Sequence, residues 1–482
     1  MPTIFISYKR DAKDDEFLVK VIQDHFAADH DIFIDKQIPP GAEWAKRIKD
    51  ELESRDFVFV LMSEASIASE MVRGEIETVR NAFDGSKPRL VPIRVRYAGK
   101  YPYPLNAYLD QLQWADWAGE HDTDKVLKQL ASTLNGADVS PASSPAPRVS
   151  VPPPSLNVED CHVVRDEENT AVRLLTRTSG IGVTLNLVGP RQMGKTQLLQ
   201  RANRAARTAG KHVAVIDFKL FDGATLRDNF YESFCLLLSD ALAVDVPIAS
   251  SFGKFPPPYA CTRHIKSALS QRAGRTVLVL DELTRLIAFK DHADFFAMLR
   301  SWHESRPDGA QFDNLDLVLV AALDLHDFTK GKNSSPFNVG TSIVLKDFKE
   351  SETLALVQNR TQRVSLAAAS KLHGLLSGHP WLTQLALDAV EGNSLTLSEA
   401  STVAELLVEN GPFNDHLRSG LFGLQALPPT AQSELAAALA GRSCSESTFA
   451  TLAGAGFLSG TAAIPRARCA LYKTFFQQYF PA

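Results

Sequence analysis

The chain has 482 residues, which is too many for a single domain and predicts two to four. Hydrophobic residues make up 45% of it and charged residues 22%, as in ordinary globular proteins. The formal net charge of −5 is small for this length, so we expect neither a nucleic-acid-binding surface nor a polybasic membrane anchor.

The N-terminus and the cysteines bear on the cellular compartment. The opening stretch, MPTIFISYKR, has a short apolar run followed by charges and lacks the apolar core of a secretory signal. No apolar run approaches the roughly 20 residues of a membrane span. The five cysteines are scattered and include no CxxC pair, which argues against a disulfide framework or a structural zinc site. We therefore expect a cytoplasmic protein with no membrane partner.

Short apolar runs alternate with helical stretches over residues 1–135. Near-continuous apolar strands separated by helices predict a parallel sheet covered on both faces. The length suits a flavodoxin-like α/β domain with five strands, whose binding sites lie at the carboxyl ends of the strands. We expect strands at 3–7, 31–34, 57–62 and 90–95, and a weaker one at 112–114.

Within this region, residues 68–83 (ASEMVRGEIETVRNAF) predict an amphipathic helix. At about 100° per residue, Glu70 and Glu77 fall on a solvated face. Glu75 instead sits at the edge of the apolar stripe, beside Met71. Because charged side chains are seldom buried, the general expectation for Glu75 is a boundary residue that reaches water. The stripe itself consists of Val72, Ile76, Val79 and Phe83.

Residues 136–157 (GADVSPASSPAPRVSVPPPSLN) form the clearest boundary in the chain. The segment is rich in proline and serine and almost uncharged, which predicts an extended, unpacked linker. Alternation of strands and helices resumes after it, and no internal repeat is visible. We expect strands at 183–188, 213–218, 277–281, 317–322 and 342–345, then a mainly helical region with a short hairpin near GFLSGTAAIPRA.

The segment GPRQMGKT, residues 189–196, matches the phosphate-binding pattern G-x-x-x-x-G-K-[ST] between a predicted strand and a predicted helix. The glycines let backbone N–H groups surround phosphate oxygens, and the helix N-terminus adds a positive dipole end. Lys195 is placed to reach the β and γ phosphates, and the Thr196 hydroxyl to coordinate Mg²⁺. The residues expected to bind ATP or ADP here are Gly189, Arg191, Gly194, Lys195, Thr196 and Gln197.

A second acidic motif, TVLVLDELTRL, complements the phosphate loop. Asp281 ends an apolar strand, where a second carboxylate on the Mg²⁺ side is expected, and Glu282 is placed to orient an attacking water. Two alternatives stay open. In the first, Asp281 only caps the end of its strand. In the second, Glu282 belongs to a switch ATPase that binds nucleotide but hydrolyses it slowly.

Four segments in this order resemble the AAA-like ATPase domain of the STAND class of signal-transducing switches: GPRQMGKTQLL, LVLDE, SPFNVGTSIVLKDF and GHPWLTQLAL. The resemblance implies that Pro380 lies at the adenine base and that nucleotide controls self-association into an oligomer or filament. It implies a nucleotide-binding domain at 158–345, a helical subdomain at 346–405 and a winged-helix-like subdomain at 406–482. The sequence departs from the class in lacking an arginine in the sensor strand and a Met-His-Asp motif.

Three N-terminal segments resemble a bacterial TIR domain over residues 1–135: IFISYKRD, IFIDKQIPPGAEWAKRI and SEMVRGEI. Some TIR domains are adaptors, and others cleave NAD⁺ with a glutamate in a Ser-x-Trp-Cys-x-x-Glu-Leu-like segment. Glu75 falls on that catalytic position, and Met71 replaces the usual aromatic residue. The resemblance implies that Ser7 and Tyr8 line the same pocket. It also implies that Phe33 and Trp44 add aromatic surface there, although Phe33 suits the core better and Trp44 suits either place.

One carboxylate is chemically sufficient for this reaction. A glycosidase needs a second carboxyl group to protonate its leaving oxygen, whereas nicotinamide leaves from a cationic form and needs no proton. What remains is stabilisation of an oxocarbenium-like ribose, which a partly desolvated carboxylate does well because its field is little screened.

The leading hypothesis is an NAD⁺ glycohydrolase, activated by ATP-dependent oligomerisation, that releases nicotinamide and ADP-ribose or a cyclic variant. The resemblance implies a role in bacterial anti-phage defence, with an unidentified trigger such as a phage or host protein. ATP with Mg²⁺ is the expected cofactor, and whether it is hydrolysed is left open. One alternative is a non-enzymatic TIR scaffold assembled by the ATP-binding switch. Another is an ATPase motor with the TIR domain as an address tag.

Overall fold

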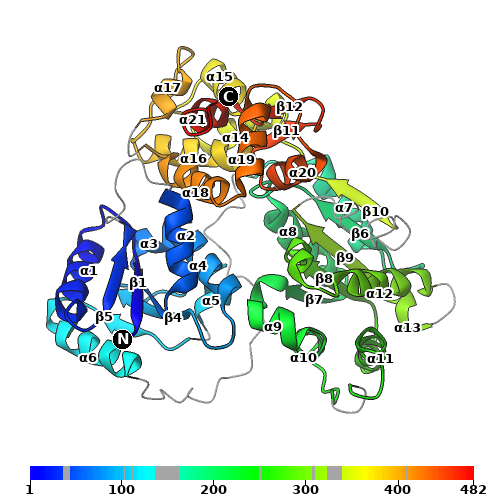
Figure 1. The fold of residues 1–482 in the computed structure, drawn as a ribbon. Helices are drawn as coiled ribbons and strands as arrows, with labels where there is room; N and C mark the ends of the chain where they lie inside the picture. The colour runs from blue at the N-terminus through cyan, green and yellow to red at the C-terminus, as the bar shows by residue number, and fades with distance from the viewer. Residues whose placement is uncertain are drawn as a thin grey trace. The chain divides into compact units, whose positions relative to one another are not determined.

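The structure is a computed structural model. It describes residues 1–35, 44–102, 104–110, 112–135, 162–248, 252–306, 310–322, 339–408 and 411–481. The chain divides into two compact units, and Figure 1 shows its elements coloured along the sequence. The first unit comprises Met1–Ser155, Lys219–Thr225 and Asp415–Pro428, and the second comprises Leu156–Phe218, Leu226–Asn414 and Pro429–Ala482.

The first unit contains a five-stranded parallel sheet in the order β2-β1-β3-β4-β5. This is the flavodoxin-like arrangement that the alternation of strands and helices predicts. Four of the predicted strands are confirmed to within one residue. The strands are β1 (Thr3–Ser7), β2 (Asp31–Ile34), β3 (Phe57–Met62), β4 (Arg89–Val95) and β5 (Ala115–Trp117).

The position predicted for the last strand, 112–114, is wrong. The backbone N–H of Leu112 closes a turn after the preceding helix, so this part of the chain is not available for pairing. The strand is Ala115–Trp117, with Trp117 beside Val95 of β4. Its two buried ends flank an exposed residue, which is the alternation of a half-buried edge strand.

Helices cover both faces of this sheet. One apolar cluster joins alternate residues of β1, such as Ile4 and Ile6, to α1 and α6, and a second joins Phe5 to α2, α4 and α5. This double coverage explains why every side chain of β3 is buried. The helices are α1 (Lys13–Phe26), α2 (Trp44–Ser54), α3 (Glu64–Ala68), α4 (Glu70–Ala82), α5 (Leu105–Leu109) and α6 (Thr123–Leu134).

The predicted helix at 68–83 begins at Glu70 because Ser69 is its N-cap. The Ser69 hydroxyl accepts a hydrogen bond from Val72 N at 3.3 Å, and Ser69 itself is extended, which separates α4 from α3. The expectation that Glu70 lies on a solvated face is wrong. Its side chain is 13% exposed, and its Oε2 lies 2.9 Å from Nδ1 of His416.

The second unit contains another five-stranded parallel sheet, in the order β10-β6-β9-β8-β7. β9 lies between β6 and β8, so the loop after β6 and the end of β8 lie on the same edge of the sheet. All five predicted strands are confirmed to within two residues. They are β6 (Thr184–Val188), β7 (His212–Asp217), β8 (Thr276–Asp281), β9 (Leu315–Ala321) and β10 (Thr341–Val344).

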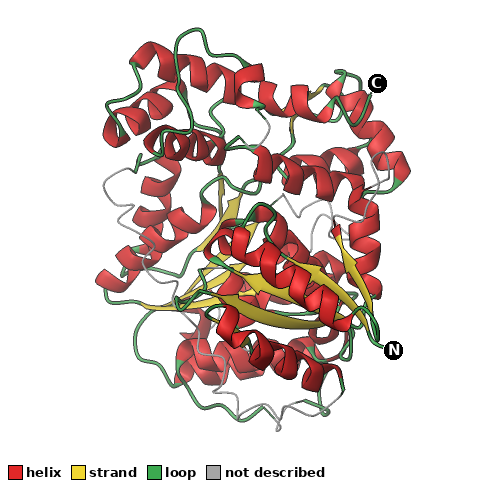
Figure 2. Cartoon of the chain, turned by 90° about the vertical axis from the view of Figure 1, so that its left-hand side faces the viewer, coloured by secondary structure: helices red, strands yellow, loops and turns green. Residues whose placement is uncertain are grey.

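Helices make up most of the chain after β10, and Figure 2 shows the helices and strands in separate colours. A short antiparallel hairpin, β11 (Leu458–Gly460) with β12 (Pro465–Ala467), confirms the predicted one. No helix in the described part of the chain is long and apolar enough to cross a bilayer. The helices from residue 166 onward are α7 (Asp166–Leu175), α8 (Lys195–Thr208), α9 (Gly223–Asp228), α10 (Phe230–Leu242), α11 (Pro257–Ser270), α12 (His292–Glu304), α13 (Ala310–Asp313), α14 (Glu350–Arg360), α15 (Leu366–Leu376), α16 (Pro380–Glu391), α17 (Val403–Leu406), α18 (Asn414–Gln425), α19 (Pro429–Leu439), α20 (Glu446–Gly454) and α21 (Ala470–Phe476).

A buried ion pair stabilises the amino-terminal end of the second sheet. Lys211 Nζ lies 2.6 Å from Asp316 Oδ2, and both side chains are 1% exposed. The other carboxylate oxygen accepts a hydrogen bond from Val183 N at 2.8 Å, and Arg275 lies 3.7 Å away. The charge of Asp316 is therefore compensated from three sides, as a buried carboxylate requires.

Replacing Lys211 with methionine should destabilise the protein by about 3–5 kcal/mol, because it leaves Asp316 as a buried and poorly compensated charge. The measurement is chemical denaturation of the full chain. The matched control is Lys49→Met, which removes an exposed ion pair with Glu53 at 3.9 Å and should change stability by less than about 1 kcal/mol. Equal effects of the two substitutions would contradict the assignment.

Candidate catalytic and nucleotide-binding sites

Glu75 lies at the meeting point of β1 and α4. Its side chain is buried, with the residue only 5% exposed, and its Oε2 accepts a hydrogen bond from Ser7 Oγ at 2.5 Å. Ser7 is the last residue of β1 and is 1% exposed. The structure thus brings together two of the residues predicted for the catalytic site, at the carboxyl edge of the sheet. The interpretation of Glu75 as a boundary residue that reaches water is wrong.

Burial raises the pKa of Glu75 from its ordinary value of 4.5 to about 8. The Ser7 hydrogen bond lowers this pKa, the negative charges of Asp35 and Asp415 raise it, and the positive charge of Arg10 lowers it. At neutral pH the carboxyl group in this conformation is therefore mostly protonated. A strongly perturbed carboxyl beside a hydroxyl at the end of a parallel strand is typical of a functional site.

For the other residues predicted to bind NAD⁺, the structure shows no hydrogen bond to Glu75 among the described residues. Tyr8 follows Ser7 and is 8% exposed, and Met71 packs half-buried against the apolar cluster around α4. Phe33 is a core residue with its ring centroid 5.5 Å from that of Phe5, so its role in the site stays a prediction. Trp44 begins α2, but its side chain and the loop 36–43 lie outside the described residues.

Asp15 is a residue near this site that the sequence interpretation missed. It is fully buried on α1, and its Oδ2 accepts hydrogen bonds from Ser66 Oγ at 2.6 Å and Ser63 Oγ at 2.9 Å. Ser66 in turn accepts a hydrogen bond from Lys9 N at 3.1 Å. This network fixes the chain immediately after Ser7. Burial raises the pKa of Asp15, and the two serine hydroxyls lower it.

The phosphate loop of the second unit has the geometry that its sequence predicts. Gly194 adopts a left-handed conformation with φ of +86° as the N-cap of α8, a helix of 14 residues. Lys195 begins that helix, and its Nζ donates hydrogen bonds to the carbonyls of Gly189 at 2.6 Å and Pro190 at 2.8 Å. Thr196 is exposed in the first turn. These residues fit the phosphates of a nucleotide.

The acidic motif lies on the same edge of the second sheet as the phosphate loop. Asp281 ends β8, and its Oδ1 accepts a hydrogen bond from Glu282 N at 2.8 Å. Glu282 has a φ of +59°, a strained conformation for a non-glycine residue that is common at functional sites. The described residues contain no cluster of three His, Cys, Asp or Glu side chains that could hold a metal alone. The binding of Mg²⁺ by Thr196, Asp281 and phosphate oxygens stays a prediction.

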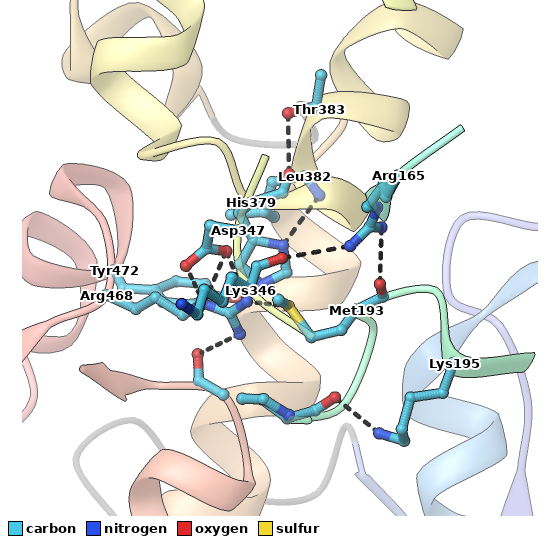
Figure 3. A network of polar contacts seen from close by, with 12 residues as sticks. Arg165, Met193, Lys195, Lys346, Asp347, His379, Leu382, Thr383, Arg468 and Tyr472 are labelled. Atoms are coloured by element: carbon cyan, nitrogen blue, oxygen red, sulfur yellow. Dashed lines mark hydrogen bonds and ion pairs between the residues drawn. The ribbon is translucent and has the colours of Figure 1, made fainter. Parts of the chain in front are cut away.

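Arg165 is a contact to the phosphate loop that the sequence interpretation missed. It precedes α7, and its Nη2 donates a hydrogen bond to the Met193 carbonyl at 2.9 Å (Figure 3). Its Nη1 donates to the Lys346 carbonyl at 3.3 Å, and its guanidinium lies 4.5 Å from the Phe348 ring centroid. Burial lowers the pKa of Arg165, but the side chain remains charged at neutral pH.

Arg468, which follows β12, is the second missed contact. It is 5% exposed, and its Nη2 and Nε donate to the Asp347 carboxylate at 2.6 Å and 3.1 Å (Figure 3). Its Nη2 also contacts the sulfur of Met193 in the phosphate loop. The same guanidinium thus contacts both Asp347 and the phosphate loop. Nearby, Arg191 N donates to the Gly454 carbonyl at 3.2 Å, so the C-terminal segment contacts the phosphate loop twice.

The segment Gly378–Pro380 lies close to this network. Gly378 has a φ of +69°, and a Cβ atom there would lie 2.1 Å from the Phe348 carbonyl oxygen, so only glycine fits. His379 is buried with its Nε2 3.2 Å from the Tyr472 hydroxyl, and Figure 3 shows it near Arg165 and Arg468. Pro380 is buried at the start of α16. Its contact with an adenine base stays a prediction.

The three remaining predicted nucleotide-binding residues lie in or beside the phosphate loop. Arg191 and Gln197 are exposed around the phosphate loop, and Gly189 is close-packed, since a Cβ atom there would lie 3.0 Å from Leu345 Cβ. The second unit therefore brings the predicted phosphate-binding residues together on one loop. It adds Arg165 and Arg468 from segments distant in the sequence.

Comparisons with known proteins agree with this division. Residues 160–478 match the family model of the AAA-like domain, and residues 4–131 match that of the TIR domain. An uncharacterised WD repeat-containing protein of Synechocystis is 24% identical over 242 residues, which are 45% of this chain. The match spans only 20% of that relative's length.

Several solved structures resemble the chain at low similarity. The Aeropyrum pernix ORC2 protein has a TM-score of 0.41 at 15% identity, covering 68% of this chain and 96% of its own. Cdc6p from Pyrobaculum aerophilum has a TM-score of 0.38 at 12% identity, covering 67% and 99%. A STAND protein with a tetratricopeptide repeat sensor from Pyrococcus horikoshii has a TM-score of 0.30 at 13% identity, covering 66% and 43%.

The family match across residues 160–478 covers most of the chain, and the TIR match precedes it. The chain belongs to the AAA-like domain family and carries an N-terminal TIR domain.

Proposed function

We propose that the protein is an NAD⁺ nucleosidase whose TIR domain is activated when the AAA-like domain binds ATP and the chain self-associates. The observation that supports the enzymatic part best is the buried Glu75 carboxyl, hydrogen-bonded to Ser7 at 2.5 Å at the carboxyl edge of the TIR sheet. The same proposal includes a role in bacterial anti-phage defence and a trigger such as a phage or host protein.

The chemistry follows from one carboxylate. When ionised, Glu75 stabilises the positive charge that develops on the ribose as the bond between C1′ and the nicotinamide nitrogen breaks. The electron pair of that bond leaves with nicotinamide, which becomes neutral and needs no proton. Water then forms a bond to C1′ and releases a proton, which gives ADP-ribose. An acceptor within the same molecule gives a cyclic product instead. Ser7 orients the carboxylate through its hydrogen bond.

The resting environment of Glu75 supports the idea of control. Because burial raises its pKa to about 8, the group carries little charge at neutral pH in this conformation. Stabilising a developing cation requires the ionised form, so activation has to change what surrounds Glu75. Assembly of TIR domains is the change that we propose.

The AAA-like domain supplies the nucleotide site for this control. Lys195 and Thr196 are placed to bind phosphate oxygens, and a bound Mg²⁺ neutralises part of the charge of the phosphates. Arg165 and Arg468 approach the phosphate loop from a helix start and from the C-terminal hairpin. A phosphate oxygen is a far stronger acceptor for Arg468 than the Met193 thioether. Nucleotide binding therefore competes with the contacts that Arg165 and Arg468 make with Met193.

The second candidate is a non-enzymatic TIR scaffold assembled by the same switch. It is favoured by Met71 in place of an aromatic residue and by the burial of Phe33 in the core, since both reduce the aromatic surface beside Glu75. Under this alternative, nucleotide-dependent assembly persists while nicotinamide is not released.

The substitution Glu75→Gln should abolish nicotinamide release, by at least about 100-fold, because it removes the preorganised negative charge and keeps the shape. Release from NAD⁺ is measured by chromatography with ATP, at protein concentrations or crowding that promote assembly. The control is Glu77→Gln, half-buried on the same helix, which should be close to wild type. Unchanged release in Glu75→Gln would refute the site, and no release from any variant would favour the scaffold.

Stability should fall as the pH rises from about 4.5 to about 8, and Glu75→Gln should flatten that slope. The folded state keeps a proton on Glu75 over this range while the unfolded state loses it, so folding becomes less favourable as the pH rises. The shift corresponds to roughly 5 kcal/mol at most. Thermal unfolding from pH 4 to pH 9 tests this, and the prediction fails if wild type and Glu75→Gln keep parallel profiles.

Arg468→Gln should weaken ATP binding about tenfold or more, as expected for loss of a charged hydrogen-bond donor to phosphate. Lys195→Ala should weaken it at least as much. Calorimetric titration with ATP and ADP in the presence of Mg²⁺ measures both effects. The matched control is Arg466→Gln, an exposed arginine two residues earlier on the same hairpin, which should bind like wild type. A normal affinity in Arg468→Gln would show that its contact with Met193 is structural only.

A further inference from the structure

Helix α18 (Asn414–Gln425) stands apart from its neighbours in the sequence. All of it after Asn414 belongs to the first unit, together with the TIR sheet, whereas α17 before it and α19 after it belong to the second. A segment that leaves one unit to pack in the other and then returns needs contacts that offset the ordering of the chain. Those contacts involve both elements that carry the proposed catalytic residues.

The strongest contact is made by Asp415 at the first turn of α4. Its Oδ1 lies 2.6 Å from Lys9 Nζ and accepts a hydrogen bond from Ser69 Oγ at 3.0 Å, and its Oδ2 accepts one from Glu70 N. A carboxylate at a helix N-terminus is stabilised by the unpaired backbone N–H groups and the positive end of the dipole. Asp415 therefore joins the loop that follows β1 to the start of α4.

A second polar contact involves the next residue of α18. His416 Nδ1 lies 2.9 Å from Glu70 Oε2, and the two side chains are 6% and 13% exposed. The hydroxyl of Ser419, one turn further on, donates to the Glu70 carbonyl at 3.4 Å. Glu70, which the sequence predicts to lie on a solvated face of α4, is thus covered by α18.

An apolar contact completes the docking. Phe422 is 7% exposed and belongs to the same buried cluster as Val72 and Ile76 of α4. Burying a phenylalanine ring contributes about 1.5–3 kcal/mol relative to leaving it in water. The polar residues of α18 thus contact the first turn of α4, and Phe422 joins the apolar cluster to which α4 contributes.

These contacts enclose the Glu75 site. Lys9, which Asp415 holds, lies two residues after Ser7, and Ser69 and Glu70 begin the helix that carries Glu75. The Asp415 carboxylate also adds to the effect of burial that raises the pKa of Glu75. An undocked α18 removes this negative charge and frees the ends of β1 and α4 to adjust around a substrate.

Building on the proposed function, we propose that α18 is an internal inhibitor of the TIR site, held on α4 by Asp415, His416 and Phe422. Because α18 lies between α17 and α19 in the sequence, a rearrangement of the AAA-like domain is transmitted to it through the chain. Release of α18 is then the step that links nucleotide binding to NAD⁺ cleavage.

The variant Asp415→Asn in the full chain tests the proposal. Asparagine still accepts hydrogen bonds at a helix N-terminus but loses the charge that pairs with Lys9, so folding is preserved while docking weakens. We expect nicotinamide release without ATP to rise about tenfold, the effect of losing one charge-assisted contact. His416→Gln and Phe422→Ala are independent variants that should raise it in the same direction. Asp124→Asn, exposed in the first turn of α6, is the charge-matched control and should behave like wild type.

Hydrogen–deuterium exchange supplies a readout that does not depend on catalysis. Faster exchange in α18 and in the first turns of α4 is expected for Asp415→Asn, and an unchanged rate would overturn the docking role of Asp415. Suppose that the wild type releases nicotinamide with ATP. Faster exchange in Asp415→Asn without more nicotinamide release in the absence of ATP would then overturn the inhibitory role. If no variant releases nicotinamide under any condition, the proposed enzymatic function fails and with it the inhibition, while the exchange data still decide the docking.

Discussion

The hydrogen bond between Ser7 and Glu75 ties the end of the first strand to the middle of α4, and the rest of the TIR site depends on it. A carboxyl group with so little exposure is stable there only while it is protonated or otherwise compensated. The surrounding apolar clusters and the Asp15 network hold the backbone in place around it. The protonated form of Glu75 favours the folded state, whereas the proposed reaction requires the ionised form.

Much of the architecture could be predicted from the sequence because it depends on local patterns. Apolar strands such as β3 and the glycine at 194 specify their own geometry, and the phosphate loop follows from adjacent residues. Arg165 and Arg468 could not be predicted, since their contacts with Met193 cross 28 and 275 residues. Helical periodicity placed Glu75 near the apolar face, but its full burial depends on β1, which periodicity does not include.

The nucleotide site shows how distant segments share one loop. The loop after β6 contacts Arg165 ahead of α7 and Arg468 beyond the hairpin, and Asp347 pairs with the latter.

Helix α18 also bears on how such proteins diversify. Its residues fall within the AAA-like family match, yet they pack with the TIR domain. Boundaries drawn from sequence families and from packing therefore differ at this helix. A TIR domain exchanged by recombination at the proline-rich linker would lose the helix that packs with it, which limits the domain shuffling that the linker would otherwise permit.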